Sequence, residues 1–111
     1  MDPLATYREA VMTVLRAWEP RTGPESTFRF ETVFDRERDR YLLVMVGWSG
    51  HQHVHATLAH VEVIEGKLWI LCDATETGVA PELVEAGVPR DRIVLGFKSP
   101  ARRAITGYAV S

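Results

Sequence analysis

The stretch from Gly66 to Ala80 constrains the fold of this chain more than any other segment. Its first half is an apolar run after a turn residue, which is typical of a β-strand, with Trp69 on one face. The polar residues that follow predict a turn, and Gly78 to Ala86 predicts a short helix that Gly87-Val88-Pro89 ends. Strand-to-helix junctions often carry function, because backbone donors and side chains converge there. Taken alone, however, the stretch names no reaction.

The turn Glu65-Gly66 joins this strand to an earlier one that runs from about Gln52 to Ile64. A two-residue turn fixes the register of a hairpin, so the side chains can be assigned to two rows. The row expected in the core pairs Val63 with Leu68, Val61 with Ile70, and Ala59 with Cys72. The other face carries His60, Glu62, Trp69 and Leu71. Cys72 is therefore interpreted as a small apolar filler rather than a nucleophile.

The N-terminal region predicts an amphipathic helix that packs on the sheet. Asp2 and Pro3 are typical of a helix start, and Pro20 and Gly23-Pro24 predict its end and a linker. The apolar stripe consists of Leu4, Tyr7, Val11, Val14, Leu15 and Trp18.

Two further strands are expected before the hairpin. Alternation from Phe28 to Phe34 predicts a half-buried strand, and Asp35 to Asp39 predicts a solvated hairpin tip. The nearly continuous apolar run from Tyr41 to Trp48 predicts a strand covered on both faces, with Trp48 in the core, before Ser49-Gly50 reverses the chain.

A short strand is expected from Ile93 to Phe97, and Thr106 to Val110 is a candidate for a final extended segment. With 111 residues, the chain has the length of one domain. We therefore predict a single α+β domain over residues 1–111, with an N-terminal helix on a mainly antiparallel sheet of four to five strands and a second short helix.

Composition bounds the compartment and the class of partner. The single cysteine excludes an internal disulfide framework, and the chain has neither a secretory signal pattern nor a membrane-length apolar run, so we expect a cytoplasmic protein without membrane contact. The net charge of −2 argues against a stand-alone nucleic-acid binder.

The charge is uneven along the chain, being −5 over residues 62–89 and +4 over residues 90–111. One interpretation is ordinary mixing of charges on a solvated surface. The sharper interpretation is a basic patch for an acidic partner or a phosphate, made of Arg90, Arg92, Lys98, Arg102 and Arg103.

No nucleophile elbow, P-loop, dinucleotide-binding glycine pattern or zinc-knuckle cysteine pair is present. His51, His53 and His55 alternate, but three such side chains span about 13 Å of one strand, so a neighbour would have to complete a metal site. Asp73 and Glu76 flank the strand-to-helix turn; capping of that helix is favoured over acid–base or cation chemistry. Trp69, opposite the core row, is a candidate partner anchor.

Several short blocks, taken in order, form a more specific pattern. They are Val46-Gly47-Trp48, Gly66 to Ile70, Asp73 to Glu76 with Gly78-Val79-Ala80, Gly87-Val88-Pro89, Ile93 to Pro100, and Thr106 to Val110. In this order and spacing the chain resembles the XisI family, the fdxN element excision controlling factor proteins, over nearly its whole length. His51 and His60 fit positions where that family often has His, whereas His53, His55 and Lys98 depart from it.

The resemblance implies a controlling role in site-specific DNA excision and a partner, XisH, that resembles restriction-type nucleases. The family is not known as an enzyme, so no catalytic residue is carried over and no cofactor or metal is expected. The leading hypothesis is a non-enzymatic accessory protein that binds a XisH-like nuclease and reaches DNA through it. Its candidate partner surface is Trp69, His60, Asp73, Thr75 and Glu76.

Two alternatives remain open. One is a direct DNA-binding recombination factor that uses the basic C-terminal residues. The other is a small enzyme or metal protein centred on the turn from Asp73 to Glu76. The sequence also leaves open a homo-oligomer formed through a sheet edge or the face that carries Trp69.

Overall fold

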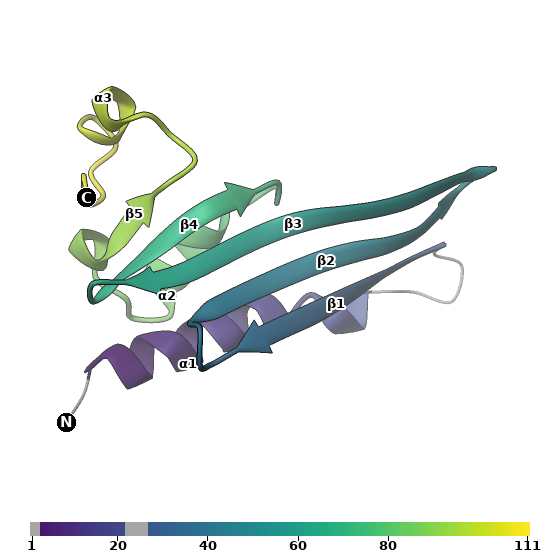
Figure 1. Ribbon diagram of the computed structural model, residues 1–111, viewed down its shortest axis with the longest axis horizontal. Helices are drawn as coiled ribbons and strands as arrows, with labels where there is room; N and C mark the ends of the chain where they lie inside the picture. Colours follow the sequence, from purple (N-terminus) through teal and green to yellow (C-terminus); the bar gives the residue numbers. More distant parts are fainter. Residues whose placement is uncertain (1–2, 22–26) are drawn as a thin grey trace.

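The computed structural model describes residues 3–21 and 27–111. Five strands form one sheet in the order β1-β2-β3-β4-β5, and all neighbours are antiparallel except β4 and β5 (Figure 1). This confirms the predicted α+β class with a mainly antiparallel sheet. The elements are α1 (Pro3–Arg16), η1 (Glu19–Arg21), β1 (Phe28–Asp35), β2 (Arg40–Ser49), β3 (Gln52–Ile64), β4 (Lys67–Asp73), α2 (Val79–Glu85), η2 (Arg90–Arg92), β5 (Ile93–Leu95) and α3 (Pro100–Arg103).

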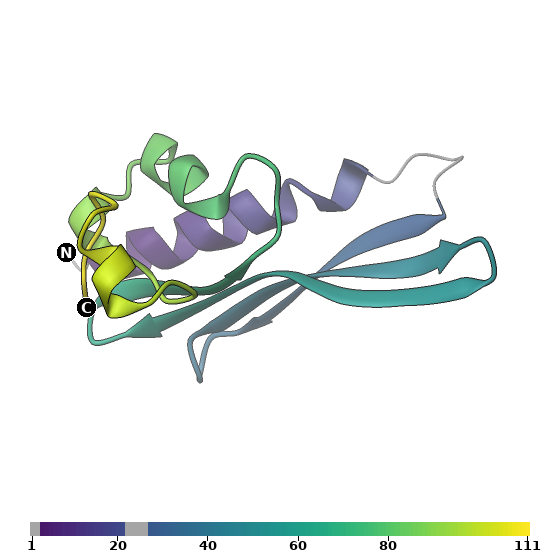
Figure 2. The same ribbon diagram turned by 90° about the horizontal axis from the view of Figure 1, so that it is seen from above.

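Both longer helices cover the same face of the sheet (Figure 2). We call this the helix face and the opposite one the open face. Val11, Met12 and Leu15 of α1 and Leu83 of α2 are buried against the strands, so the N-terminal stripe packs on the sheet as predicted. The expected helix start at Asp2 and the Gly23-Pro24 linker lie outside the described residues. The strand residues buried in this core include Tyr41, Leu43, Ala59, Val61, Leu68, Ile70, Ile93 and Leu95.

The β3–β4 hairpin has its predicted turn and, over most of its length, its predicted register. Glu65 and Gly66 both have positive φ, 48° and 78°, which matches the twist of the flanking strands. Val63 lies opposite Leu68 and Val61 opposite Ile70, as the sequence predicts.

The prediction fails beyond Ile70, where β4 contains a bulge. The register passes over Leu71, so that Cys72 lies opposite His60, and Ala59 lies opposite Asp73 instead of Cys72. A bulge exchanges the faces of the residues that follow it. Cys72 is therefore half-buried rather than a core filler, and its Sγ donates to the Thr57 carbonyl at 3.5 Å. The extra residue instead turns Asp73 to the helix face, beneath the start of α2.

The prediction for β2 also needs correction. Tyr41 and Leu43 are fully buried on the helix face, whereas Leu42 and Val44 on the open face are only half-buried. Trp48 is not in the core, because 53% of it is exposed and its ring lies 4.8 Å from that of His53. The cause is that β2 and β3 continue past the end of β4, as Figure 1 shows. We call residues 44–57 the arm.

The charged β1–β2 turn is not simply solvated. Asp39 accepts two hydrogen bonds from Arg8 of α1, at 2.7 and 2.9 Å, and one from the Tyr41 hydroxyl at 3.0 Å. The bonds from Arg8 hold the pKa of Asp39 below its ordinary value. Burial, with a further contribution from Asp39, raises the pKa of Tyr41 to about 12. The predicted hairpin tip therefore fastens α1 to the sheet.

The C-terminal segment is more compact than the sequence suggests. β5 ends at Leu95, not at Phe97, and the predicted extended segment from Thr106 contributes a single bridge, between Ala109 and Val94. The short helix α3 lies between them and was not predicted. Among the helices of residues 3–21 and 27–111, none has the length and apolar content that crossing a bilayer requires.

Candidate functional site

The turn between β4 and α2 is organised by Asp73. One carboxylate oxygen accepts hydrogen bonds from the Thr75 N–H at 3.1 Å and the Thr75 hydroxyl at 2.6 Å. The other accepts from the N–H of Val79, the first residue of α2, at 2.7 Å. The Thr75 hydroxyl in turn accepts from the Gly78 N–H at 3.1 Å. The favoured capping interpretation of Asp73 and Thr75 is therefore confirmed.

These bonds decide what the turn can do chemically. Both oxygens of Asp73 are engaged with donors of its own turn, so acid–base work or cation binding would have to displace them. Glu76 is exposed, so its carboxylate is accessible to solvent. Within the proposed partner surface, Glu76 is thus the residue of this turn most available to a partner.

Trp69 and His60 lie on the open face, away from Asp73. The His60 Nε2 atom is buried and lies 3.1 Å from a Glu62 carboxylate oxygen, out of line for a hydrogen bond but close enough for an ion pair when His60 is protonated. Glu62 also lies 3.6 Å from Arg40 Nε. The five predicted partner residues are therefore divided between the two faces of the sheet.

Arg103 covers Trp69 and holds the C-terminal segment in place. Its guanidinium carbon lies 5.1 Å from the Trp69 ring centroid. Its nitrogens donate to the carbonyls of Lys98 at 2.9 Å, Leu95 at 3.3 Å, and Gly96 and Val110 at 3.4 Å. An arginine with these bonds contributes mainly to the local fold.

The other predicted nucleic-acid residues are also engaged in local contacts. Arg90 lies over the Tyr108 ring, Arg92 donates to the Gly66 carbonyl at 3.4 Å, and the Lys98 ammonium lies 5.7 Å from the Phe97 ring. Arg102 is exposed on α3. The structure thus brings the basic residues into one region, but three of the four arginines already have partners there.

The alternating histidines lie at the arm and at the turn before it. His53 and His55 project from the open face and are exposed, and His51 lies in the β2–β3 turn. Within residues 3–21 and 27–111, no group of three His, Cys, Asp or Glu side chains is placed to hold a metal ion.

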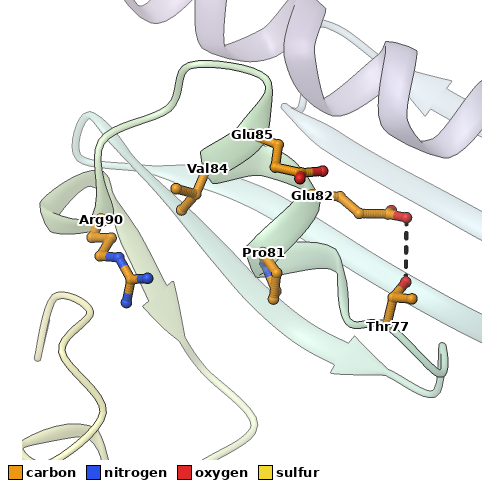
Figure 3. Close-up of a pocket in the computed structure, with 6 residues that line it drawn as sticks. All are labelled: Thr77, Pro81, Glu82, Val84, Glu85 and Arg90. Atoms are coloured by element: carbon orange, nitrogen blue, oxygen red, sulfur yellow. Dashed lines mark hydrogen bonds between the residues drawn. The ribbon is translucent and has the colours of Figure 1, made fainter.

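A shallow pocket of about 450 Å³ lies along α2 and was not predicted from the sequence (Figure 3). Glu82 and Glu85 of α2 and Arg90 of η2 supply its charged groups, and the Thr77 hydroxyl donates to Glu82 at 3.3 Å. The signal available in the sequence was the net charge of −5 over residues 62–89. Carboxylates of this kind pair well with basic groups.

Comparisons with known proteins agree on one family. The family model described as XisI protein matches residues 1–110. A XisI-like protein from Anabaena variabilis of known crystal structure is 32% identical, with a TM-score of 0.87, and the match covers 97% of this chain and 99% of that one. The crystal structure of the fdxN element excision controlling factor XisI from Anabaena variabilis is 28% identical, with a TM-score of 0.81, and covers 99% and 100%.

No curated protein matches the chain. The family match nevertheless spans both the helix-covered part of the sheet and the C-terminal segment. The resemblance inferred from the sequence blocks is therefore confirmed, and the chain belongs to the XisI family.

Proposed function

We propose that this protein is a non-enzymatic controlling factor for site-specific excision of a DNA element, and that it acts by binding a XisH-like nuclease. The observation that carries the proposal is the match over residues 1–110 to a family that includes an fdxN element excision controlling factor. The engagement of Asp73 in capping supports a binding role, because the most suggestive carboxylate of the chain serves the fold.

The acidic surface around α2 is the part of the molecule that we propose meets the partner. Glu76 precedes the helix, and Glu82 and Glu85 line its pocket. A nuclease needs a basic groove for nucleic acid, and an acidic protein can occupy such a groove and control access to it. Trp69 and His60 on the open face form a second candidate contact.

The test is direct binding between the full chain and a XisH-like nuclease protein. We expect a complex that co-purifies and has a dissociation constant of about 1 μM or tighter at low salt, weakening as salt is added. If no complex forms at micromolar concentration, the proposed function is wrong.

The surface is tested separately with two charge reversals of equal size. Glu85→Lys changes an exposed side chain at the α2 pocket and should weaken the complex by about tenfold. Glu37→Lys makes the same change in the exposed β1–β2 turn and should leave the affinity nearly unchanged. Equal effects of the two variants would retain the function but reject this surface.

Direct DNA binding through the basic C-terminal residues remains the second candidate, because the segment from residue 90 onward carries +4. It predicts a salt-dependent shift of duplex DNA by the isolated protein. Arg102→Ala is the informative variant, because Arg102 is exposed whereas replacing Arg103 would also remove bonds to four carbonyls. Retention of the full shift in Arg102→Ala would argue against this patch.

A further inference from the structure

The outer half of β3 is a sheet edge in the described part of the chain. β4 pairs with β3 only from Ala59 to Ile64, although β3 begins at Gln52. Figure 1 shows β3 continuing past the end of β4 as the border of the sheet, and Figure 2 shows the arm reaching beyond α1 and α2. His53, His55 and Thr57 are exposed along this border. An edge of this kind is a template for an added strand.

The backbone groups of this edge can be assigned from the neighbouring pair. The Trp48 N–H donates to the Thr27 carbonyl at 3.2 Å, so the peptide groups of Trp48 point toward β1 and those of Gly47 point toward β3. Gly47 lies opposite Val54, so the N–H and C=O groups of His53, His55 and Thr57 point away from β2, toward the border. The bond from Cys72 Sγ to the Thr57 carbonyl agrees with this direction.

The chemistry of the arm favours a neutral occupant. Residues 41–61 contain no Lys, Arg, Asp or Glu, although charged residues make up 25% of the chain. Edge strands are usually protected by charged side chains or proline, and neither is present here. A nucleic acid or a strongly charged peptide would find no fixed countercharge along the edge, whereas an identical strand would bring no charge of its own.

We propose that the protein self-associates by antiparallel pairing of this edge with the same edge of a second copy. A two-fold axis beside Val54 places each His53 opposite the partner copy's His55, and such pairs exchange two backbone hydrogen bonds. The register is limited by Ala74, whose N–H donates to the Leu58 carbonyl at 2.7 Å and closes the space beside β3. The second arm fits between this point and the β2–β3 turn, continuing the sheet from one copy into the other.

The pairing is tested first by the mass of the full chain in solution. Sedimentation at concentrations from about 1 to 100 μM should show a monomer–dimer equilibrium. A chain that remains monomeric throughout this range would overturn the proposal.

Cysteine cross-linking then tests the register. Val54→Cys places the two sulfurs next to the axis and should form an intermolecular disulfide under mild oxidation. Ala56→Cys lies on the same strand and the same face but two residues from the axis, and it should not cross-link. A dimer that cross-links through Ala56→Cys and not through Val54→Cys would reject this pairing, and the unchanged chain with its native Cys72 supplies the background.

Charge substitution tests the surface without relying on oxidation. Replacing both His53 and His55 by Lys sets like charges opposite each other, and replacing both by Glu does the same, so each variant should dimerise at least about tenfold more weakly. Mixing the two variants should restore a dimer of one copy of each. Failure of the mixture to associate would contradict the pairing. The pairing would also be contradicted if the chain alone stayed monomeric and a XisH-like partner occupied this edge instead.

Discussion

At one end of the sheet, α1 and α2 bury the strands, whereas at the other end β2 and β3 extend past the end of β4 as the arm, with β1 paired to β2 as far as Gly47 (Figures 1 and 2). The covered end contains the fully buried side chains, among them Tyr41, Leu68, Ile70 and Leu83. The arm exposes Trp48, His53 and His55. The same β2–β3 hairpin therefore serves two physical roles along its length.

The two ends of the sheet differ in the side-chain contacts that join one element to another. In the covered end, Arg8 of α1 reaches Asp39, and the buried Tyr41 hydroxyl joins them. In the arm, β2 pairs with β3 on one side and, as far as Gly47, with β1 on the other, and the Trp48 ring lies against that of His53. None of the largest fully buried side chains of the described residues lies in the arm, so we expect the stability of the arm to depend on the covered end.

The largest expected contrast comes from truncating one large side chain in each region. Ile70→Ala opens a cavity in the core and should lower the free energy of unfolding by about 2–5 kcal/mol. Trp48→Ala removes more atoms, but from a site that is 53% exposed, and should cost less than about 1 kcal/mol. Urea unfolding followed by circular dichroism at low protein concentration measures both. Similar costs would show that the arm is part of the cooperative core.

Gly47 is an expected exception to the rule that substitutions in the arm cost little stability, because this arm residue tolerates no side chain. A Cβ at Gly47 would lie 2.0 Å from the Thr27 carbonyl oxygen and 2.8 Å from the Phe28 Cα. Gly47→Ala should therefore push β1 from β2 and cost about 1–3 kcal/mol. Hydrogen exchange of the Trp48 amide, which donates to Thr27, should accelerate with it.

The control for Gly47 is Gly50 in the β2–β3 turn. A Cβ at Gly50 would meet no atom within 4 Å, but φ is 63°, so Gly50→Ala should cost only the backbone term of about 1 kcal/mol. The Trp48 amide should keep its protection in this variant. If Gly50→Ala exposed that amide as strongly as Gly47→Ala, the cause would be fraying of the turn rather than the contact with β1.

The sequence predicts best where the structure is set by local residues. The turn Glu65-Gly66 accounts for the register of its hairpin because the preference for positive φ is local. The bulge after Ile70 was missed because Ile70 and Cys72 continue the apolar alternation of β4. Its position follows from a contact six residues ahead, in which Asp73 accepts the Val79 N–H and caps α2.

The misinterpretation of the β1–β2 turn has the same origin. Alternating charges from Asp35 to Asp39 look like a solvated tip when only neighbours are considered. The partner that half-buries Asp39 is Arg8, 31 positions away. Trp48 was likewise assigned to the core because it ends the apolar run of β2. The sequence of that run gives no sign that β4 and the helices end before they reach Trp48. Long-range partners thus account for the errors in both regions.

The link between α1 and the turn gives the next prediction. Asp39→Asn keeps the shape and the tolerance of positive φ but removes the charge that Arg8 and Tyr41 bind, and it should cost about 1–2 kcal/mol at pH 7. Glu37→Gln, in the same turn and exposed, should change stability little. Equal costs would mean that the turn acts through its general charge.

The pH dependence of that cost has a defined sign. The pKa of Asp39 in the folded state is lower than its ordinary 3.8, so its contribution is complete above that value and is lost as pH falls through the folded-state pKa. The stability difference between the natural chain and Asp39→Asn should therefore shrink as the pH is lowered below about 4. A difference that stays constant from pH 7 to pH 3 would show that the neutral acid is bound equally well.

The smallest expected effect is a gain in stability at the covered end. Glu65 has a φ of 48°, in the left-handed region that Asn adopts more readily than Glu. Glu65→Asn should therefore raise the free energy of unfolding by about 0.5 kcal/mol, measured as a higher urea midpoint with an unchanged slope. Gly66→Ala, with φ at 78°, should act in the opposite direction.

Because this turn closes the hairpin that carries the core pairs Val61–Ile70 and Val63–Leu68, the gain from Glu65→Asn should appear in global unfolding. If it appeared only as slower local exchange near the turn, the β3–β4 hairpin would open independently of the core, and the covered end would itself consist of two separate units.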